Sequence, residues 1–399
     1  MTAAYEIAPP SPAEHEPLLA VLSQGLGFAT DRARSWLDQL GAEHVRVARH
    51  GARIAGVYGV IPMGLWFGGR AVPTGGVTAV AVAPEDRSSG VGSLMMRHAV
   101  AAMREAGTPL AALYPATFPV YRRVGFETAG TRIAYRLALR ELDVRGGVRG
   151  NEPLAVERYG PAHHAAVDAC YQRRARRTAG NVARTPYMWS RLIAPVNAAV
   201  HAYVVVADGE VEGFVAFSQR DLAVTPRYEL AVRDLVAITP RAGRRILRLL
   251  ADHRSMADHA VVYAAPGEPV LQLLGEEPWQ IADHHRWMVR VLDVPAALAA
   301  RGWGACARGE IALDVRDDVV PANQATFALA VDAGRAEVRR IAPGPRAVTI
   351  DVRALAALYT GYLGAEELRV RGGIDGDDGD LARLGSLFAG PAPWMAEIF

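Results

Sequence analysis

The sequence predicts an α+β protein of more than one domain, in which strands lead directly into helices. Its 399 residues are more than one hydrophobic core organises, so length alone indicates two or three domains. Residues 77–82 form an apolar, β-branched run of strand length, and Pro84 ends it because proline cannot extend a sheet ladder. Residues 145–150 contain three glycines in six positions, which is typical of a linker.

The first part of the chain is predicted to contain helices and then strands. His50-Gly51 supplies a tight turn between two strands. A later helix is expected to begin at Ser89 or Gly90, because apolar residues recur from there at helical spacing until Gly107 ends it. In order, the expected elements are helices at 17–25 and 31–41, strands at 45–49, 54–61 and 77–82, a helix at 90–106, a strand at 110–114 and a short helix closed by Gly125.

The turn between the strand at 77–82 and the next helix has the chemistry of a pyrophosphate site. The first N–H groups of a helix have no partner within it and lie at the positive end of its dipole, so an anion there collects several hydrogen bonds. Gly90 and Gly92 let a phosphate approach the backbone, and Arg87 adds a permanent positive charge. An ordinary strand-to-helix turn is the alternative, because two glycines before a helix are weak evidence alone.

A second motif lies downstream, where Tyr121 is followed by Gly125 and Phe126. Together with the Arg87-x-x-Gly90-x-Gly92 spacing, it resembles the GNAT superfamily of N-acetyltransferases, whose loop of this kind binds the pyrophosphate of acyl-coenzyme A. In that superfamily two central strands splay apart around the thioester, and the tyrosine of such a helix reaches the sulfur. The resemblance implies this role for Tyr121. The alternative is a tyrosine packed on the sheet with its hydroxyl at the rim.

The remainder of the chain contains a second α/β pattern and then a third, mixed pattern. Residues 235–245 take the place of the phosphate loop in the second pattern, but Gly243 is followed by arginines and the Gly-x-Gly spacing is lost. We therefore expect this copy to be structural. Its elements are strands at 202–207, 211–219 and 227–237 and a helix from Pro240. The third pattern, which looks like a sterol carrier protein type domain, has strands at 309–315, 326–331 and 336–340 and helices at 351–359 and 381–387.

This three-part order resembles the Eis (enhanced intracellular survival) family of actinobacterial N-acetyltransferases over essentially the whole chain. The resemblance implies an α+β (α/β-like) fold with two tandem GNAT-like domains and a sterol carrier protein type domain. We expect a catalytic domain at 1–148, a degenerate GNAT-like domain at 149–290 and the sterol carrier protein-like domain at 291–399. The resemblance also implies acetyl-CoA as co-substrate, a homohexamer, and acetylation of polycationic small molecules such as aminoglycosides.

Acetyl transfer to an amine needs a base, stabilisation of the developing oxyanion and a proton for the leaving thiolate. Backbone N–H groups of Val80, Ala81 and Val82 can meet the second need if their strand bulges away from its neighbour. Tyr121 can meet the third, because a phenol of ordinary pKa, about 10, is a plausible donor to a thiolate. The resemblance implies further cofactor contacts from Arg87, Ser88, Ser89, Gly90, Val91, Gly92, Ser93, Ala116 and Thr117.

The expected base lies at the end of the chain. Residues 391–399 are apolar and aromatic with no polar tail, which indicates that they pack into the structure. In the Eis family the terminal carboxylate acts as the base, and Phe399 matches that role. The alternative is a hydrophobic anchor for the last domain. Family members often carry a carboxylate immediately before the terminal Phe, whereas Ile398 stands here and Glu397 is one position earlier, so an acidic lining for a polycation is in doubt.

Charge, cysteine content and motifs limit the classes of partner and the compartment that we expect. The formal net charge of +2 gives no strong field for nucleic acid or a membrane surface, and the two cysteines indicate a reducing compartment. We expect a cytoplasmic protein, because neither a signal segment nor an apolar run of membrane-spanning length is visible. No metal is expected: the acidic run 375–380 lacks the Glu that a calcium loop needs, and Asp380 is predicted to cap the following helix.

Two other functions stay open on sequence grounds. One is a protein-lysine acetyltransferase, which would need an open groove for a peptide. The other is a lipid-binding or scaffold protein whose acetyltransferase core is vestigial. The intact Arg87-x-x-Gly90-x-Gly92 spacing and Tyr121 speak against the vestigial reading.

Overall fold

The computed structural model describes residues 5–142, 154–195, 198–222 and 226–399, so the predicted linker at 145–150 lies outside the described residues. The chain divides into two compact units. The first consists of Met1–Gly130, Arg286–Pro391 and Ile398–Phe399, and the second of Thr131–His285 and Ala392–Glu397.

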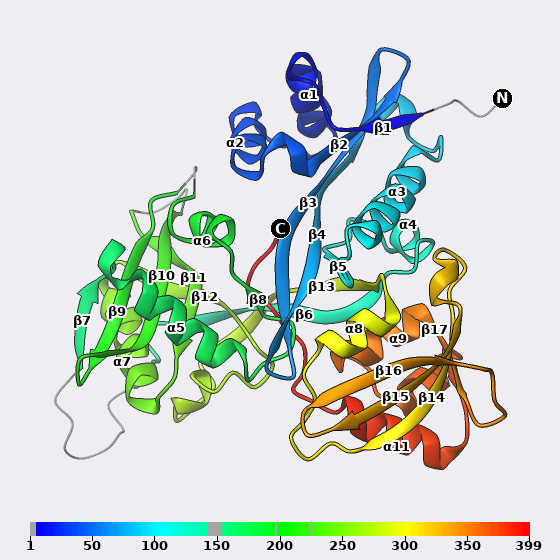
Figure 1. The fold of residues 1–399 in the computed structure, drawn as a ribbon. Coiled ribbons are helices and arrows are strands. Elements are labelled where there is room, and N and C mark those ends of the chain that lie inside the picture. Colours follow the sequence, from blue (N-terminus) through cyan, green and yellow to red (C-terminus); the bar gives the residue numbers. More distant parts are fainter. Residues whose placement is uncertain (1–4, 143–153, 196–197, 223–225) are drawn as a thin grey trace. The chain divides into compact units, whose positions relative to one another are not determined.

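The first unit contains a twisted sheet with helices on both faces. Its strands, in spatial order, are β1 (Glu6–Ala8), β2 (Val45–His50), β3 (Arg53–Phe67), β4 (Arg70–Val82), β5 (Leu110–Leu113) and the last residues of β13 (Trp279–Val291). β4 and β5 are parallel, so a crossover joins them, and α3 (Val91–Glu105) supplies it. Helices α1 (His15–Leu26), α2 (Thr30–Leu40) and α4 (Phe118–Arg122) complete this part (Figure 1).

Glycines in β3 show which helix covers which face. A Cβ on Gly56 would meet Met95 of α3, whereas a Cβ on Gly59 would meet Trp36 of α2. Because side chains of a strand alternate between faces, α3 lies on one face of β3 and α2 on the other. The apolar stripe of α3 forms the core on its side, with Met95, Met96, Ala99, Val100 and Met103 buried.

The C-terminal domain of the first unit has its own five-stranded sheet. The spatial order is β16 (Arg335–Ile341), β15 (Ala325–Asp332), β14 (Gly309–Arg316), β17 (Val348–Asp351) and β18 (Ile374–Asp375). Four helices accompany it: α8 (Val294–Ala300), α9 (Val352–Thr360), α10 (Ala365–Val370) and α11 (Asp378–Phe388). The prediction that Asp380 caps the last helix is wrong. Asp377 is at the N-cap and Asp380 lies in the first turn, where its charge still favours the helix dipole.

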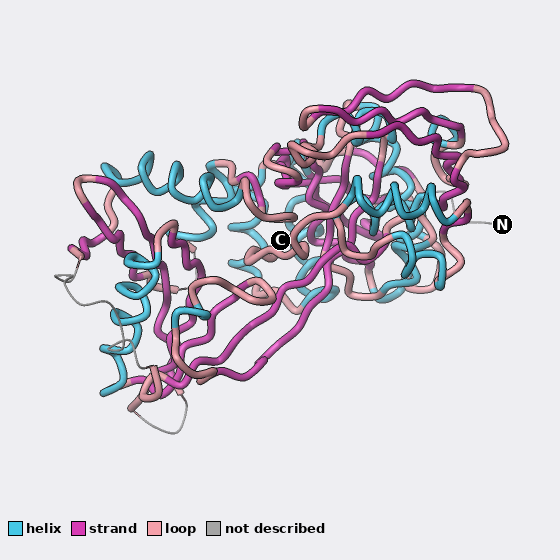
Figure 2. Tube along the Cα trace, turned by 90° about the horizontal axis from the view of Figure 1, so that it is seen from below, coloured by secondary structure: helices cyan, strands magenta, loops and turns pink. Residues whose placement is uncertain are grey.

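The second unit repeats the strand–helix–strand arrangement. In spatial order its strands are β6 (Glu127–Ala138), β12 (Ala257–Ala264), β11 (Tyr228–Ala237), β10 (Glu210–Asp221), β9 (His201–Ala207) and β7 (Ala155–Arg158). β11 and β12 are parallel and α7 (Pro240–Ala251) joins them, as α3 joins β4 and β5. The short β8 (Val182–Ala183) and helices α5 (His164–Ala175) and α6 (Pro186–Ile193) belong to this unit (Figure 1). Figure 2 distinguishes helices, in cyan, from strands, in magenta.

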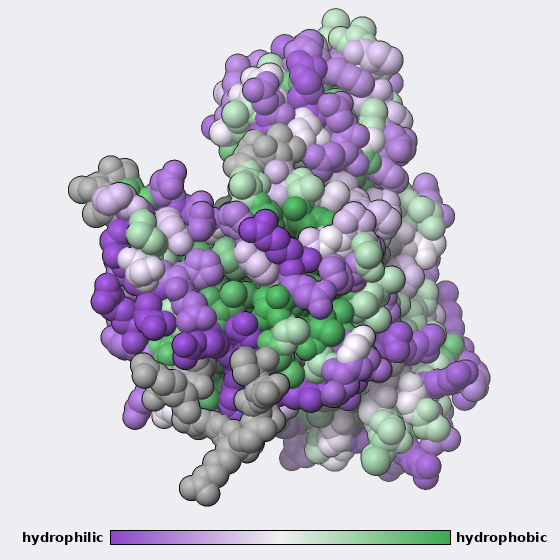
Figure 3. Space-filling view, turned by 90° about the vertical axis from the view of Figure 1, so that its left-hand side faces the viewer, coloured by the Kyte–Doolittle hydropathy of each residue, from purple (hydrophilic) through white to green (hydrophobic). Residues whose placement is uncertain are grey.

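The face drawn in Figure 3 is largely hydrophilic and has a patch of hydrophobic residues near its centre. Within the described ranges, the most exposed large hydrophobic side chains are Val370, at 89%, and Ile281, at 65%. None of the helices in those ranges is both long and apolar enough to cross a bilayer.

Candidate active site

Strand β4 carries a β-bulge where the predicted oxyanion site requires one. The register pairs Val57 with Ala81 and Gly59 with Thr78. Ala79 and Val80 therefore both lie opposite the single residue Tyr58. Ala79 has a φ of +51°, a left-handed conformation that costs a residue with a Cβ about 1 kcal/mol. The bulge breaks the regular ladder next to the three residues whose N–H groups were predicted to face the thioester carbonyl.

β4 and β5 also separate, as the GNAT resemblance led us to expect. They pair over three residues only, ending with Gly76 opposite Ala112. β4 then continues to Val82 while β5 ends at Leu113, so the backbone groups of β4 that face away from β3 have no ladder partner in β5. We call this divergence of the two strands after Gly76 the β4–β5 fork.

The loop from β4 to α3 presents the predicted anion-binding residues to solvent. Gly90 is the N-cap of α3, so the helix begins where the sequence predicted. Arg87, Ser88, Ser89 and Gly90 are exposed, Val91 is buried as the first helical residue, and Gly92 and Ser93 are half-buried. The first backbone N–H groups of α3 thus lie beside an exposed loop that carries a cation, which suits a diphosphate.

The two glycines of the loop, Gly90 and Gly92, differ in backbone conformation and in surroundings. Gly90 has a φ of +92°, a backbone conformation that favours glycine. A Cβ on Gly92 would meet only Val82, at 3.6 Å, an ordinary van der Waals contact. Neither space nor backbone among the described residues requires a glycine at position 92.

Asp86 anchors the loop from the inside. Its buried carboxylate accepts hydrogen bonds from Arg53 and from the Tyr5 hydroxyl, and His50 lies 3.7 Å away. The hydrogen bond from Arg53 lowers the pKa of Asp86 below its usual value. This negative charge is therefore neutralised by the protein and does not oppose an anion at the helix terminus.

Tyr121 lies on α4 with its side chain only 6% exposed. Its ring packs edge to face against Phe126, with centroids 6.2 Å apart. Burial raises the pKa of the phenol to about 12. The hydroxyl therefore keeps its proton at neutral pH, as a proton donor must. Ala116 and Thr117, the other residues predicted for the cofactor on this side, are exposed and directly precede the helix, with Thr117 as its N-cap.

The end of the chain lies at the β4–β5 fork. A Cβ on Gly76 would come within 3.0 Å of Met63 and 3.3 Å of the Phe399 ring, so the glycine leaves room for both side chains. Phe399 also packs edge to face on Tyr114, the residue that follows β5. The structure thus brings Phe399 to the two strands that diverge, although it is 285 positions from Tyr114 and 323 from Gly76 in the sequence.

Glu397 has a different environment from Phe399. In the second unit its carboxylate is 2.6 Å from Arg184, which also binds Asp234 at 2.7 Å. The Arg184 side chain is 1% exposed and stacks 3.6 Å over the ring of Tyr171. The charge of Glu397 is therefore committed to a buried ion pair, and it is a poor attractor for a cationic substrate.

The second copy of the phosphate loop holds a carboxylate in place of an anion site. Thr239 is the N-cap of α7, and its hydroxyl donates to Glu212 at 2.5 Å. Arg241, in the first turn, also donates to Glu212, at 2.6 Å. The hydroxyl and the guanidinium that could meet an anion at this helix terminus are therefore already bonded to a carboxylate of the protein.

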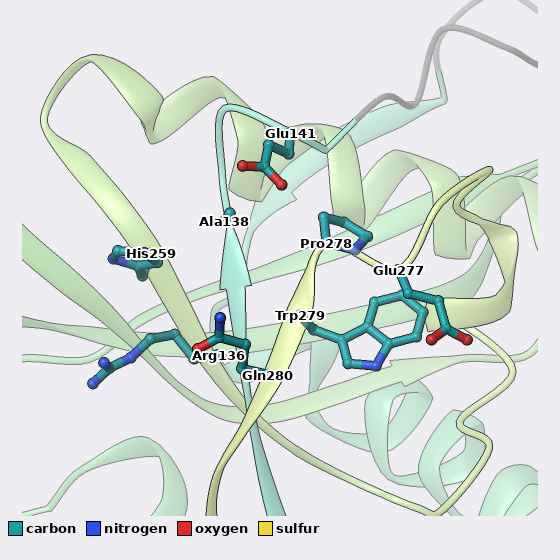
Figure 4. A pocket seen from close by; sticks show the side chains of 8 residues that line it. All are labelled: Arg136, Ala138, Glu141, His259, Glu277, Pro278, Trp279 and Gln280. Atoms are coloured by element: carbon teal, nitrogen blue, oxygen red, sulfur yellow. The ribbon is translucent and has the colours of Figure 1, made fainter.

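A separate cavity of about 250 Å³ lies in the second unit (Figure 4). Arg136, Glu141, His259, Glu277 and Trp279 are among the residues that line it, and no residue of the predicted site does. Over the described ranges, no group of three or more His, Cys, Asp or Glu side chains is arranged to hold a metal ion.

Comparison with known proteins agrees with this geometry. Residues 6–129 match an acetyltransferase (GNAT) domain, residues 180–291 match a second acetyltransferase (GNAT) domain, and residues 294–396 match a sterol carrier protein domain. An uncharacterized N-acetyltransferase of Streptomyces griseus is 30% identical over 363 residues, which is 83% of each chain. N-acetyltransferase Eis of Mycobacterium tuberculosis is 28% identical over 400 residues, 94% of each chain. The chain belongs to the Eis family of GNAT N-acetyltransferases.

A solved structure extends this likeness to the whole fold. The crystal structure of a GCN5-related N-acetyltransferase from Anabaena variabilis is 27% identical and has a TM-score of 0.93, covering 99% of this chain and 100% of that one. The predicted fold class, two GNAT domains followed by a sterol carrier protein domain, is therefore confirmed. As an Eis-family member the protein is an N-acetyltransferase, and GNAT acetyltransferases use acetyl-CoA. The exact boundaries at 148 and 290 and the roles of the individual site residues stay predictions.

Sequence reasoning missed Ala79 as the residue that makes the bulge. Nothing in the apolar run 77–82 marks one alanine for a positive φ, because the bulge depends on the register with β3. The only sequence signal was indirect: a strand that must present backbone N–H groups to a ligand cannot keep all of them in a ladder.

Proposed function

We propose that this enzyme transfers the acetyl group of acetyl-CoA directly to a primary amine of a polycationic small molecule, such as an aminoglycoside. In this proposal the Phe399 carboxylate is the base and Tyr121 is the proton donor. Both residues belong to the first unit, and so do the loop residues 87–93 and the bulged strand.

The observation that carries the proposal is the position of Phe399. Its ring lies beside Gly76, where β4 and β5 begin to separate, and packs on Tyr114. This position supports Phe399 as the base, because the GNAT resemblance implies that the thioester binds between these two strands. An apolar anchor for the C-terminal domain would instead be expected within the core of that domain.

The chemistry follows from the residues around the fork. The attacking amine loses a proton to the Phe399 carboxylate as its nitrogen forms a bond to the thioester carbon. Backbone N–H groups of Val80, Ala81 and Val82, at and beside the bulge, stabilise the negative charge on the carbonyl oxygen. As the C–S bond breaks, Tyr121 gives its proton to the thiolate of coenzyme A. Arg87 and the amides of residues 88–93 hold the pyrophosphate, with Ala116 and Thr117 beside the cofactor.

The C-terminal domain argues against the lipid-binding alternative. The guanidinium of Arg301 lies in its interior, 4.6 Å from the Trp303 ring, 5.2 Å from Tyr359 and 4.8 Å from Phe388. Burial lowers the pKa of Arg301 to about 10, so the group stays charged at neutral pH. Helix α9 is buried on nearly every side. An interior filled by a charged side chain and a buried helix is poorly suited to an apolar ligand.

The substrate class is tested by following the release of coenzyme A thiol with a panel of acceptors. The panel contains aminoglycosides, polyamines, simple monoamines and lysine peptides. We expect turnover with polycationic small molecules and little with peptides. Turnover with lysine peptides alone would favour the protein-lysine acetyltransferase, and no turnover with any amine would favour a vestigial core. Arg184 neutralises Glu397, so this carboxylate does not attract a cationic substrate. The turnover of monoamines, compared with that of polycations, shows whether the charge of the substrate affects the reaction.

The family resemblance also supports a homohexamer. Sedimentation measurements on the purified protein test this part of the proposal, and a monomer at micromolar concentration would contradict it.

A further inference from the structure

The turn that follows Tyr121 is held by side chains from β13 and from the C-terminal domain. The first contact is made by Arg290, on β13, which binds Asp317 through two hydrogen bonds of 2.7 and 2.8 Å. Both side chains of this ion pair are fully buried. Asp317 also accepts hydrogen bonds from the backbone N–H groups of Val319 and Val320, so its position is fixed by its own loop.

Arg290 lies directly against Gly125. A Cβ at this position would come within 2.7 Å of the guanidinium carbon and of Nε. Gly125 also has a φ of +88°, so both its backbone and its surroundings require glycine. The pair Arg290–Asp317 therefore forms a rigid support under the turn that links Tyr121 to β6.

The second contact is made by Glu127, which follows the same turn and is 3% exposed. Arg122 closes the turn by donating to Glu127 at 2.8 Å, and Arg371, at the end of α10, donates to the other carboxylate oxygen at 3.1 Å. Burial alone would raise the pKa of Glu127. The hydrogen bonds from Arg122 and the Thr128 amide, with the charges of Arg122 and Arg371, lower it instead.

Tyr121 is therefore followed by a short turn that contacts two residues far away in the sequence, Arg290 at Gly125 and Arg371 at Glu127. We propose that the C-terminal domain is a positioning scaffold for the proton donor, acting through the Arg290–Asp317 pair and the Arg371–Glu127 pair. Neither arginine touches the reacting atoms in this account. They set the position of α4 and hence of the Tyr121 hydroxyl. The inference rests on the proposed role of Tyr121.

Position matters because a displacement of about 1 Å at a reacting group can cost up to about a hundredfold in rate. Arg371 is the better probe, since its side chain is 42% exposed and its loss leaves no buried cation. Arg369, on the same helix, is a matched control. It is 36% exposed and pairs with Asp378 at 2.8 Å inside the C-terminal domain, away from the turn.

The experiment is a double-mutant cycle on the full-length enzyme with acetyl-CoA and the best amine of the panel. We expect Arg371→Met to lower kcat about fivefold to twentyfold with the KM for acetyl-CoA unchanged. Arg371→Lys should recover most of the loss, and Arg369→Met should have no effect on kcat. In a Tyr121→Phe background, Arg371→Met should cause no further loss, because a misplaced hydroxyl no longer matters once it is absent. Thermal melting establishes that every variant is folded.

The outcomes separate this inference from the proposed function. If Tyr121→Phe lowers kcat but Arg371→Met does not, or if the two losses multiply in the double variant, the scaffold role is overturned while Tyr121 remains the donor. If Tyr121→Phe keeps the wild-type kcat, the proposed function fails and the inference fails with it.

Discussion

The rings of Phe399 and Tyr114 meet edge to face, with centroids 5.7 Å apart and planes at 74°. Tyr114 directly follows β5, the strand that separates from β4. A contact of this kind contributes about 0.5–1.5 kcal/mol beyond the burial of the two rings. It fixes Phe399, the residue proposed to supply the base, beside the strands that diverge.

Replacement of Tyr121 by Phe removes the hydroxyl and keeps the ring that packs on Phe126. We expect kcat to fall by roughly 10²- to 10⁴-fold if proton donation limits the rate. The Kd for acetyl-CoA, measured by calorimetry, should stay the same. Tyr228→Phe, in β11 of the second unit, is the control and should leave kcat unchanged.

The pH dependence of kcat checks the protonation state of Tyr121. Because burial raises its pKa to about 12, the acid form persists through the alkaline range. We therefore expect no loss of wild-type kcat between about pH 8 and 10 that comes from ionisation of Tyr121. The pH profiles of the wild type and of Tyr121→Phe should have the same shape in this range. A tyrosine of ordinary pKa, about 10, would already be half ionised at pH 10.

The same shift has a consequence for stability, with a definite sign. Between pH of about 10 and about 12 the unfolded chain loses the Tyr121 proton while the folded chain keeps it. The contribution of this group to stability is therefore complete below pH of about 10 and is lost as the pH rises through that window. Tyr121→Phe should flatten the alkaline limb of the free energy of unfolding, as measured by urea titration.

Gly92→Ala separates ligand binding from folding. The added methyl group meets only Val82, at 3.6 Å, and alanine is the better helix former by up to about 1 kcal/mol. We expect an unchanged or higher melting temperature and an affinity for acetyl-CoA about tenfold or more weaker. Gly90→Ala is the comparison, because its φ of +92° makes a loss of stability of about 1 kcal/mol the expected result. If Gly92→Ala and the wild type bind acetyl-CoA with equal affinity, the proposed close approach of phosphate to this backbone is wrong.

Ala79 tests the conformational cost of the bulge. Because its φ is +51°, Ala79→Gly should raise the free energy of unfolding by up to about 1 kcal/mol. Ala79→Val should lower it by about 1–3 kcal/mol, since a β-branched residue is rare at positive φ. Ala71→Gly, in the same strand with an ordinary backbone, should destabilise by about 0.5–1 kcal/mol. Chemical denaturation of the three variants checks the order.

The starts of helices are predictable from the sequence because their signals are local. α3 begins after Gly90, α7 begins at Pro240 with Thr239 as N-cap, and α9 begins after the N-cap Asp351. Each of these residues acts on backbone groups within one turn, so no distant contact is needed.

Strand lengths are less predictable, because pairing partners decide them. The sequence ended the second strand of the first hairpin at residue 61, before Pro62, yet β3 continues to Phe67. β2 pairs with β3 only as far as Gly59, so the missing N–H of Pro62 costs no hydrogen bond to β2. The long hairpin with β4 holds this extension in place.

The residues in and around the candidate site are likewise predictable from the sequence only where the signal is local. The loop at 87–92 and Tyr121 are recognisable because the chemistry of an anion site and a phenol lies in short motifs. Arg290, Asp317 and Arg371 are not, since their relation to Gly125 and Glu127 arises only when segments 165 to 244 residues later in the chain pack against the turn.

The central claim is that the backbone carboxylate of Phe399 is the base. The most direct test is a semisynthetic enzyme in which that carboxylate is replaced by a carboxamide, which keeps the ring contacts with Tyr114 and Gly76. We predict that the rate of acetyl transfer falls by roughly 10²- to 10⁴-fold, with the affinity for acetyl-CoA and the melting temperature unchanged. A carboxamide enzyme that turns over at the wild-type rate would contradict the account.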